Sequence, residues 1–323
     1  MEEKGKKKRK KKYIPYDYEA AYTKSMDDLH EWFASQMLSS VKGRGKSRTI
    51  YALKEIKAGS QFEVEIYPQF NNIADIPEEG RRIVKDNSRA QRNLNDKNAR
   101  KYLERLINEN FGTGDIWITL TYDDEHLPAD GDFDAALKDV QLFFNRINYR
   151  RKKKGLPNAK YVYITAYDSG EEIRWHHHII MDGALDMDTV ESCWGQSSRN
   201  EVRRIQEDED GLSGLANYII KQKDRLKSEK RWRSSRGLKK PDIKVVHSKQ
   251  PEKGRGNYKP IATYIDGMIR DRDTIRTVLS KWYPHLDFTD AEVYYNDFNC
   301  MFYIHARMRE KRKTDGAETG KKT

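Results

Sequence analysis

Three consecutive histidines, His176, His177 and His178, interrupt the apolar run Trp175–Met181. The composition of this run predicts a β-strand. Because side chains alternate between the two faces of a strand, His176 and His178 point the same way, about 7 Å apart at the backbone, and His177 points to the opposite face. Two imidazoles fixed on a rigid strand can bind one divalent ion and leave positions open for a substrate. The alternative is that these histidines only pack or cover the surface.

A tyrosine and a lysine form a second candidate pair. Tyr218 and Lys221 are three residues apart in an expected helix with Ser213 as its N-cap, so they share a helix face. A phenol has a pKa of about 10 and needs nearby positive charge before it can attack as a nucleophile. Lys221 would supply that charge. The alternative is an ordinary core aromatic, since the chain has 19 tyrosines.

The elements that must position these residues follow a defined order. Ile116–Tyr122 is apolar nearly throughout, which is typical of a central strand. Apolar residues at helical spacing follow from Phe133 to Ile147. The β-branched run Tyr161–Thr165 and the turn at 168–170 lead into the histidine strand and predict a β-hairpin. This β-α-β-β order is of the split βαβ kind. We expect an α+β fold with a central antiparallel sheet and helices packed on one face.

The remaining segments carry structural signals only. Residues 49–69 predict a small hairpin, and a basic amphipathic helix is expected from Ser88 to Asn110. A helix is expected within residues 258–280 and a strand over 293–308. We expect a basic disordered tail at 1–12, an accessory region at 13–85, a domain with the histidines and the tyrosine at 86–250, a second accessory region at 251–308 and a disordered tail at 309–323.

The charge of the chain favours a polyanionic partner. Its 323 residues include 62 Lys and Arg against 51 Asp and Glu, a net charge of +11. Basic side chains fill most of Lys4–Lys12, and such a block binds nucleic acid without sequence preference. The alternative for this block is a solubilising tail.

Several classes of protein are excluded. No apolar run approaches the ~20 residues of a membrane-spanning helix, and the N-terminus does not resemble a signal peptide, so a cytoplasmic protein is expected. The two cysteines, Cys193 and Cys300, lack the spacing of a disulfide framework or a cysteine zinc site. The segment Val41–Ser47 lacks the first glycine of a phosphate loop, which excludes an ATPase.

Three segments then occur in a significant order: Trp117–Tyr122, the His-x-His strand 176–178 and the Tyr-x-x-Lys helix 218–221. Together they resemble the three motifs of HUH endonucleases, the rolling-circle replication initiators. The similarity is greatest to the single-tyrosine initiators of gokushovirus-type microviruses and of small plasmids and mobile elements of Gram-positive bacteria. It covers about Ser88 to Gln250, including the basic segment 234–241. The sequence departs from the family at His177, where a bulky hydrophobe is usual. On the face opposite the metal a histidine could be tolerated, or it could compete as a ligand.

The resemblance implies a nicking reaction. Tyr218 would attack a phosphodiester of single-stranded or extruded DNA, leaving a 5′-phosphotyrosine and a free 3′-hydroxyl. His176 and His178 would hold Mg²⁺ or Mn²⁺, and Asp168 would be the third ligand that relatives supply from the preceding strand. Lys221 would neutralise the phosphate or lower the pKa of Tyr218.

The resemblance also implies partners. The substrate would be single-stranded DNA of an origin hairpin, and a host DNA polymerase and helicase would continue replication in the cytoplasm of a bacterial host. No membrane partner is expected. The candidate DNA contacts are Arg174, Trp175, Lys223 and Arg225.

Three rival functions stay open on sequence alone. A relaxase or a single-tyrosine transposase would use the same chemistry on other DNA. A histidine-based metal hydrolase would cleave with water and form no protein–DNA adduct. A DNA-binding protein without catalysis would require the three ordered motifs to be accidental or decayed.

Overall fold

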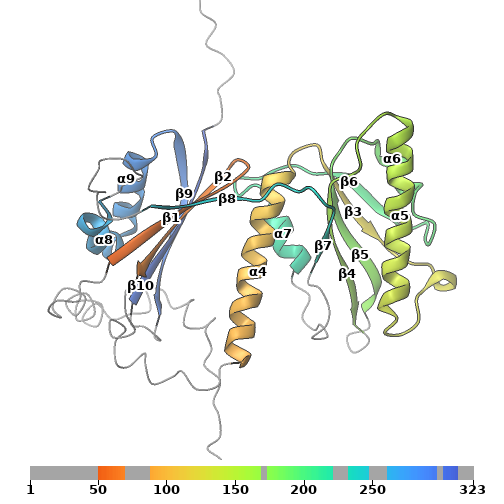
Figure 1. The fold of residues 1–323 in the computed structure, drawn as a ribbon, viewed down its shortest axis with the longest axis horizontal. Coiled ribbons are helices and arrows are strands. Elements are labelled where there is room, and N and C mark those ends of the chain that lie inside the picture. The colour runs from red at the N-terminus through yellow and green to blue at the C-terminus, as the bar shows by residue number, and fades with distance from the viewer. Residues whose placement is uncertain are drawn as a thin grey trace, which may run out of the picture.

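The computed structural model describes residues 50–69, 88–168, 173–220, 232–246, 260–296 and 301–311. They form two five-stranded antiparallel sheets with helices, which confirms the expected α+β class. The long helix α4 (Ser88–Asn110) stands between the two sheets (Figure 1). The basic block Lys4–Lys12 lies outside the described residues, and so do residues 312–323 of the expected C-terminal tail.

The sheet that carries the histidines has the order β6-β3-β5-β4-β7. Its strands are β3 (Ile116–Leu120), β4 (Tyr161–Asp168), β5 (Ile173–Met181), β6 (Glu201–Arg204) and β7 (Arg233–Ser234). β5 lies between β3 and β4 and runs antiparallel to both. The helix α5 (Phe133–Lys153) connects β3 to β4 along the chain. This is the split βαβ arrangement that the order of elements predicted, with β4 and β5 as the predicted hairpin. The short helix α6 (Met187–Glu191) follows β5.

Helices cover both faces of this sheet. On one face, Ile118 packs in a core with Phe143 of α5. On the other, Trp117 packs with Leu103 of α4 and with residues of α7 (Ser213–Ile220). The expectation of helices on one face only is therefore corrected. The physical reason lies in β3, which is buried on both faces, as a strand between two helical layers must be.

The second sheet has the order β8-β1-β2-β10-β9. Its strands are β1 (Ile50–Ala58), β2 (Gln61–Gln69), β8 (Asp242–Val246), β9 (Leu286–Asn296) and β10 (Met301–Glu310). β1 and β2 are the hairpin predicted over residues 49–69. The helices α8 (Ile261–Arg270) and α9 (Arg272–Trp282) share its apolar core. Two helices and two strands thus stand where one of each was expected.

The strands of this second sheet come from distant parts of the chain. β1 and β2 precede α4, β8 follows the histidine sheet, and β9 and β10 come last. The two regions expected as separate accessory parts therefore contribute to one sheet, while the expected domain boundaries stay predictions. Among the described helices, none is long and apolar enough to cross a membrane.

Candidate metal and nucleophile site

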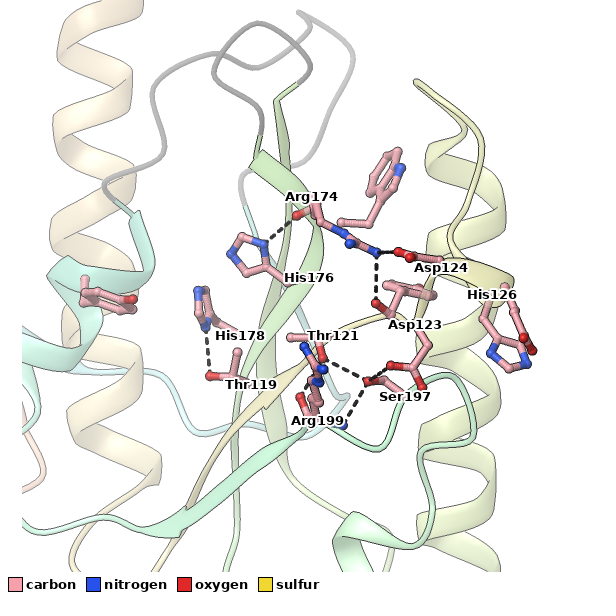
Figure 2. A pocket seen from close by; sticks show the side chains of 14 residues that line it. Thr119, Thr121, Asp123, Asp124, His126, Arg174, His176, His178, Ser197 and Arg199 are labelled. Atoms are coloured by element: carbon pink, nitrogen blue, oxygen red, sulfur yellow. Dashed lines mark hydrogen bonds and ion pairs between the residues drawn. The ribbon is translucent and has the colours of Figure 1, made fainter.

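An open cleft of about 920 Å³ lies at the ends of β3 and β5, beside α7 (Figure 2). His176, His178 and Tyr218 line it. Thus the residues selected from two separate motifs meet in one cleft. The remaining lining mixes polar and charged side chains with the aromatic residues Tyr122 and Trp175. It comes largely from the segment that follows β3, from the start of β5 and from a loop around Arg199.

The two even-numbered histidines share a face, as strand alternation predicted. Their ring centroids lie 4.8 Å apart. His176 Nδ1 donates to the Arg174 carbonyl oxygen at 2.8 Å, and His178 Nδ1 is 3.4 Å from the Thr119 hydroxyl oxygen. The Nε2 atoms of both histidines take no part in these hydrogen bonds. Burial lowers the pKa of both imidazoles, that of His178 to about 4, so both are neutral near pH 7, the form that binds metals.

His177 points to the opposite face, into the α5 core, and is fully buried. Its Nε2 lies 2.9 Å from the Tyr122 hydroxyl oxygen and its Nδ1 3.0 Å from the Thr165 hydroxyl oxygen. Burial, with the neighbouring histidines, lowers its pKa to about 3. Both ring nitrogens are already bonded within the core. His177 is therefore no competitor for an ion in the cleft, and its role is packing.

Tyr218 projects from α7 into the cleft, with 59% of its surface exposed. Its ring centroid lies 5.4 Å from that of His178 and 5.9 Å from that of Trp117. The Trp117 ring in turn stacks on His178 at 5.2 Å. Lys221, the predicted partner of this tyrosine, lies outside the described residues, as do Lys223 and Arg225.

Carboxylates also border the cleft. Its lining includes Asp123 and Asp124, in the segment that follows β3. Asp124 begins the 3₁₀ turn η3 (Asp124–His126), and Asp123 precedes it. This acidic segment begins where the expected strand Ile116–Tyr122 ends, and no function was predicted for it from the sequence. Its position next to a strand that pairs with the histidine strand was the available signal. Asp168, the predicted third ligand, ends β4 opposite Ile173, and its ligand role stays a prediction.

Asp123 holds the loop that carries Arg199. Its carboxylate accepts from the Ser197 hydroxyl at 2.9 Å and from the Ser198 backbone N–H at 3.3 Å. The loop is also bonded to β3, because the Thr121 hydroxyl donates to the Arg199 carbonyl oxygen at 2.6 Å. The backbone of Arg199 is thus held at the cleft wall, where its exposed side chain joins the lining (Figure 2). This residue was not predicted from the sequence.

Of the predicted DNA contacts, Arg174 and Trp175 are described. Arg174 lines the cleft with a half-exposed side chain that pairs with Asp124 at 2.6 Å. Trp175 is 1% exposed, and its ring packs in the α5 core between Phe133 and Tyr167, with centroids 4.7 and 4.1 Å away. A buried ring cannot stack on a base. The expected DNA contact of Trp175 is therefore corrected.

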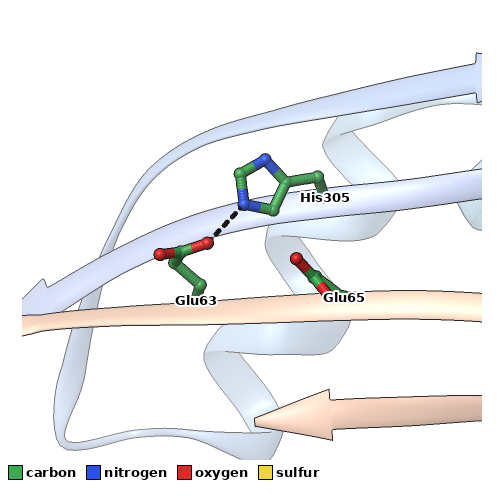
Figure 3. Close-up of side chains that lie close together, drawn as sticks. All are labelled: Glu63, Glu65 and His305. Atoms are coloured by element: carbon green, nitrogen blue, oxygen red, sulfur yellow. Dashed lines mark hydrogen bonds and ion pairs between the residues drawn. The ribbon is translucent and has the colours of Figure 1, made fainter. Parts of the chain in front are cut away.

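Among the described residues, one group of three potential metal ligands lies within 4.8 Å, and it is on the other sheet: Glu63, Glu65 and His305 (Figure 3). Arg105 Nη2 is already 2.7 Å from Glu63 Oε2 and 2.6 Å from Glu65 Oε1. The guanidinium supplies the positive charge that these carboxylates need. This group is an ion-pair cluster rather than a metal centre.

Residues 115–223 match a family model whose description begins "Replication-associated protein ORF2". The matched segment runs from β3 past the end of α7 and contains both cleft histidines and Tyr218. It supports a replication initiator family and a role in replication initiation. No curated protein matches the chain. One similar crystal structure is that of the hypothetical protein ORF119 from Sulfolobus islandicus rod-shaped virus 1, at 19% sequence identity and a TM-score of 0.27. The similarity covers 40% of this chain and 97% of that chain, and nothing further follows from it.

Proposed function

We propose that this protein initiates replication by nicking single-stranded DNA at an origin, with Tyr218 as the nucleophile. One observation carries the proposal: the ring of an exposed tyrosine stands 5.4 Å from the ring of His178, inside one open cleft. The replication-associated family match covers both residues. The same chemistry would serve a relaxase or a single-tyrosine transposase, which differ in the DNA that they recognise.

The reaction is a transfer of one phosphodiester linkage. The Tyr218 oxygen forms a bond to phosphorus, the bond from phosphorus to the 3′ oxygen breaks, the phenol loses its proton, and the leaving 3′ oxygen gains one. The products are a 5′-phosphotyrosine and a 3′-hydroxyl that a host polymerase can extend. The covalent bond preserves the energy of the linkage, so rejoining requires no ATP.

The side chains of the cleft have distinct parts in this proposal. The exposed phenol of Tyr218 is accessible to a DNA strand, while His178 and Trp117 contact its ring. Lys221 would lower the pKa of the phenol or neutralise the phosphate. Arg174 and Arg199, at the cleft wall, would contact backbone phosphates.

The donor set of the cleft fits a divalent ion. His176 and His178 are neutral, their Nε2 atoms take no part in the hydrogen bonds of the rings, and carboxylates line the same cleft. Among the described residues, none of these carboxylates forms a group of three ligands with both imidazoles within 4.8 Å. These two imidazoles would hold Mg²⁺ or Mn²⁺, with Asp168 as the proposed third ligand. When bound, such an ion polarises a phosphodiester and stabilises charge on its oxygens.

A covalent-adduct assay tests the proposal. The protein is incubated with labelled single-stranded DNA from its own replicon and Mn²⁺, and a denaturing gel is run. We expect a labelled protein band that disappears with chelator and in Tyr218→Phe. The matched control is Tyr149→Phe, because Tyr149 is another exposed tyrosine, at 56%, and lies on α5. It should retain the band.

The other outcomes separate the rival functions. Free cleavage products without an adduct would indicate a hydrolase that uses water. DNA binding with neither product would indicate a non-catalytic DNA-binding protein. An adduct that survives in Tyr218→Phe would mean that another residue is the nucleophile.

A further inference from the structure

The helix that carries Tyr218 is short, and contacts from elsewhere hold it. α7 has eight residues, and helices of that length are marginal by themselves. Its first turn is held by Asn108 of α4. Asn108 Oδ1 accepts from the Leu212 backbone N–H at 2.8 Å, and Nδ2 is 3.4 Å from Ser213 Oγ. The same Nδ2 donates to the Glu104 carbonyl oxygen at 3.1 Å, which fixes the amide on its own helix.

The chain approaches Asn108 very closely at this point. Gly211 has φ of 67°, and a Cβ there would lie 2.6 Å from Asn108 Oδ1 and 2.9 Å from Nε2 of Gln61 in β2. On the other side, a Cβ at Gly59 would lie 2.1 Å from the Asn108 carbonyl oxygen. Glycine is required at Gly59 because a Cβ would overlap a backbone oxygen, and at Gly211 because its positive φ disfavours other residues. Three elements therefore meet at Asn108: the β1–β2 turn, α4 and the start of α7.

The second sheet fixes α4 itself. Arg105 Nε donates to Glu63 Oε1 at 2.9 Å, and Nη2 donates to Glu63 Oε2 at 2.7 Å and to Glu65 Oε1 at 2.6 Å. His305 of β10 completes this cluster through Glu63. Glu109 accepts from the Gly59 backbone N–H at 2.8 Å. Bidentate pairs of this kind specify geometry as well as energy.

We infer that Asn108 is a positioning residue for Tyr218, and that the sheet of β1, β2, β8, β9 and β10 acts through α4 to hold the nucleophile against the histidines. All five strands of this sheet lie outside the family match at 115–223. This positioning role assigns the second sheet a part in catalysis, and it rests on the proposed function. Asn108 itself lies on α4 and is not among the residues that line the cleft.

The test compares Asn108→Ala with Asn110→Ala. Asn110 is a matched control, because its amide also donates to a carbonyl four residues earlier and also bonds a distant segment, the backbone of Lys239. Misplaced reacting groups can cost about 100-fold in rate, so we expect Asn108→Ala to slow adduct formation by about 10- to 100-fold. DNA affinity should stay unchanged, and Asn110→Ala should react at nearly the rate of the unmodified protein.

A conservative variant separates positioning from mere stability. Asn108→Asp keeps the acceptor for the Leu212 N–H and places a negative charge at the start of α7, which a helix N-terminus favours. We expect this variant to restore most of the rate lost in Asn108→Ala. Failure of Asn108→Asp to do so, with folding intact, would mean that the acceptor is not what matters.

Hydrogen exchange gives a readout that does not depend on activity. Backbone amides of residues 216–220 should exchange faster in Asn108→Ala than in Asn110→Ala. Equal exchange in the two variants would overturn the inference even if adduct formation proceeds. A protein that forms no adduct but shows the expected exchange difference would overturn the proposed function and leave the positioning role standing.

Discussion

The ring of Tyr218 meets the ring of His178 at 5.4 Å between centroids and at an angle of 68°. The two residues come from different elements, α7 and β5, and Trp117 of β3 contacts both rings. Because Trp117 is only 2% exposed, its indole is held firmly by the core. Trp117, a packed side chain that contacts both rings, therefore contributes to the placement of the candidate nucleophile relative to the candidate ligand.

Replacing this indole should impair the reaction more than DNA binding. Trp117→Phe removes part of the surface that both rings contact, so we expect adduct formation to fall by about tenfold and stability to fall by about 1–3 kcal/mol. Trp194→Phe is the control, because Trp194 is a buried indole of the opposite face. Single-turnover adduct formation and chemical unfolding would be measured on both. Equal rates in the two variants would contradict the role of Trp117.

Adjacent histidines should have separable roles. His177→Ala leaves the hydroxyl groups of Tyr122 and Thr165 without their imidazole partner and opens a cavity, so we expect a loss of about 2–5 kcal/mol of stability. The folded variant should still gain thermal stability from Mn²⁺. His176→Ala should lose that gain, because it removes one of the two proposed ligands. For an ion at 100 times its Kd, the gain is about 2.7 kcal/mol. Melting temperatures with and without Mn²⁺ check both, and the reverse pattern would contradict the ligand assignment.

Local periodicity was sufficient to predict the centre of the fold. Alternation along β5 correctly separated His177 from its neighbours, and the helical stripe of α5 fixed the split βαβ order. The same alternation puts Trp175 on the face of His177, toward α5. Strand alternation alone therefore places the Trp175 ring in the α5 core, against the predicted DNA contact.

Contacts between distant segments were beyond the sequence. The pairing of β2 with β10 joins residues near opposite ends of the described chain, and nothing in either strand specifies its partner. The role of Asn108 could not be predicted either, because it depends on a fold that brings the backbone of Leu212 beside its side chain. The cleft carboxylates were missed because a polar run after a strand usually only marks its end.

Arg174 should contribute to DNA affinity rather than to folding. Its ion pair with Asp124 is exposed, and such pairs add little stability. Losing one phosphate contact lowers the salt dependence of single-strand binding by about 0.7 in the log–log slope, so Arg174→Gln should bind more weakly with that smaller slope. Trp175→Phe, a neighbour whose ring faces the core, should leave the slope unchanged. Titrations at several salt concentrations decide, and an unchanged slope in Arg174→Gln would exclude a phosphate contact.

The ion-pair cluster between the second sheet and α4 should make the stability of the protein depend on pH in the acid range. Burial alone would raise the pKa of Glu65, but the charges of Lys101, Arg105 and Lys54 outweigh it and lower that pKa from 4.5 to about 2. A carboxyl whose pKa is lower in the folded state than in the unfolded state stabilises the folded protein at pH values above the pKa of the unfolded state. That contribution, on the order of 3 kcal/mol, is lost as the pH falls from about 4.5 toward 2.

Glu65→Gln should therefore be less stable at pH 7 and should lose less stability between pH 4.5 and pH 2 than the unmodified protein. Glu310→Gln is the control, because Glu310 forms an exposed pair with Lys57, and such pairs contribute about 0–1 kcal/mol. Urea unfolding across this pH range measures both. If the acid dependence of Glu65→Gln equals that of the unmodified protein, the charge of Glu65 does not hold α4, and its other contacts, including the packing of Leu103 and Ile107, fix this helix.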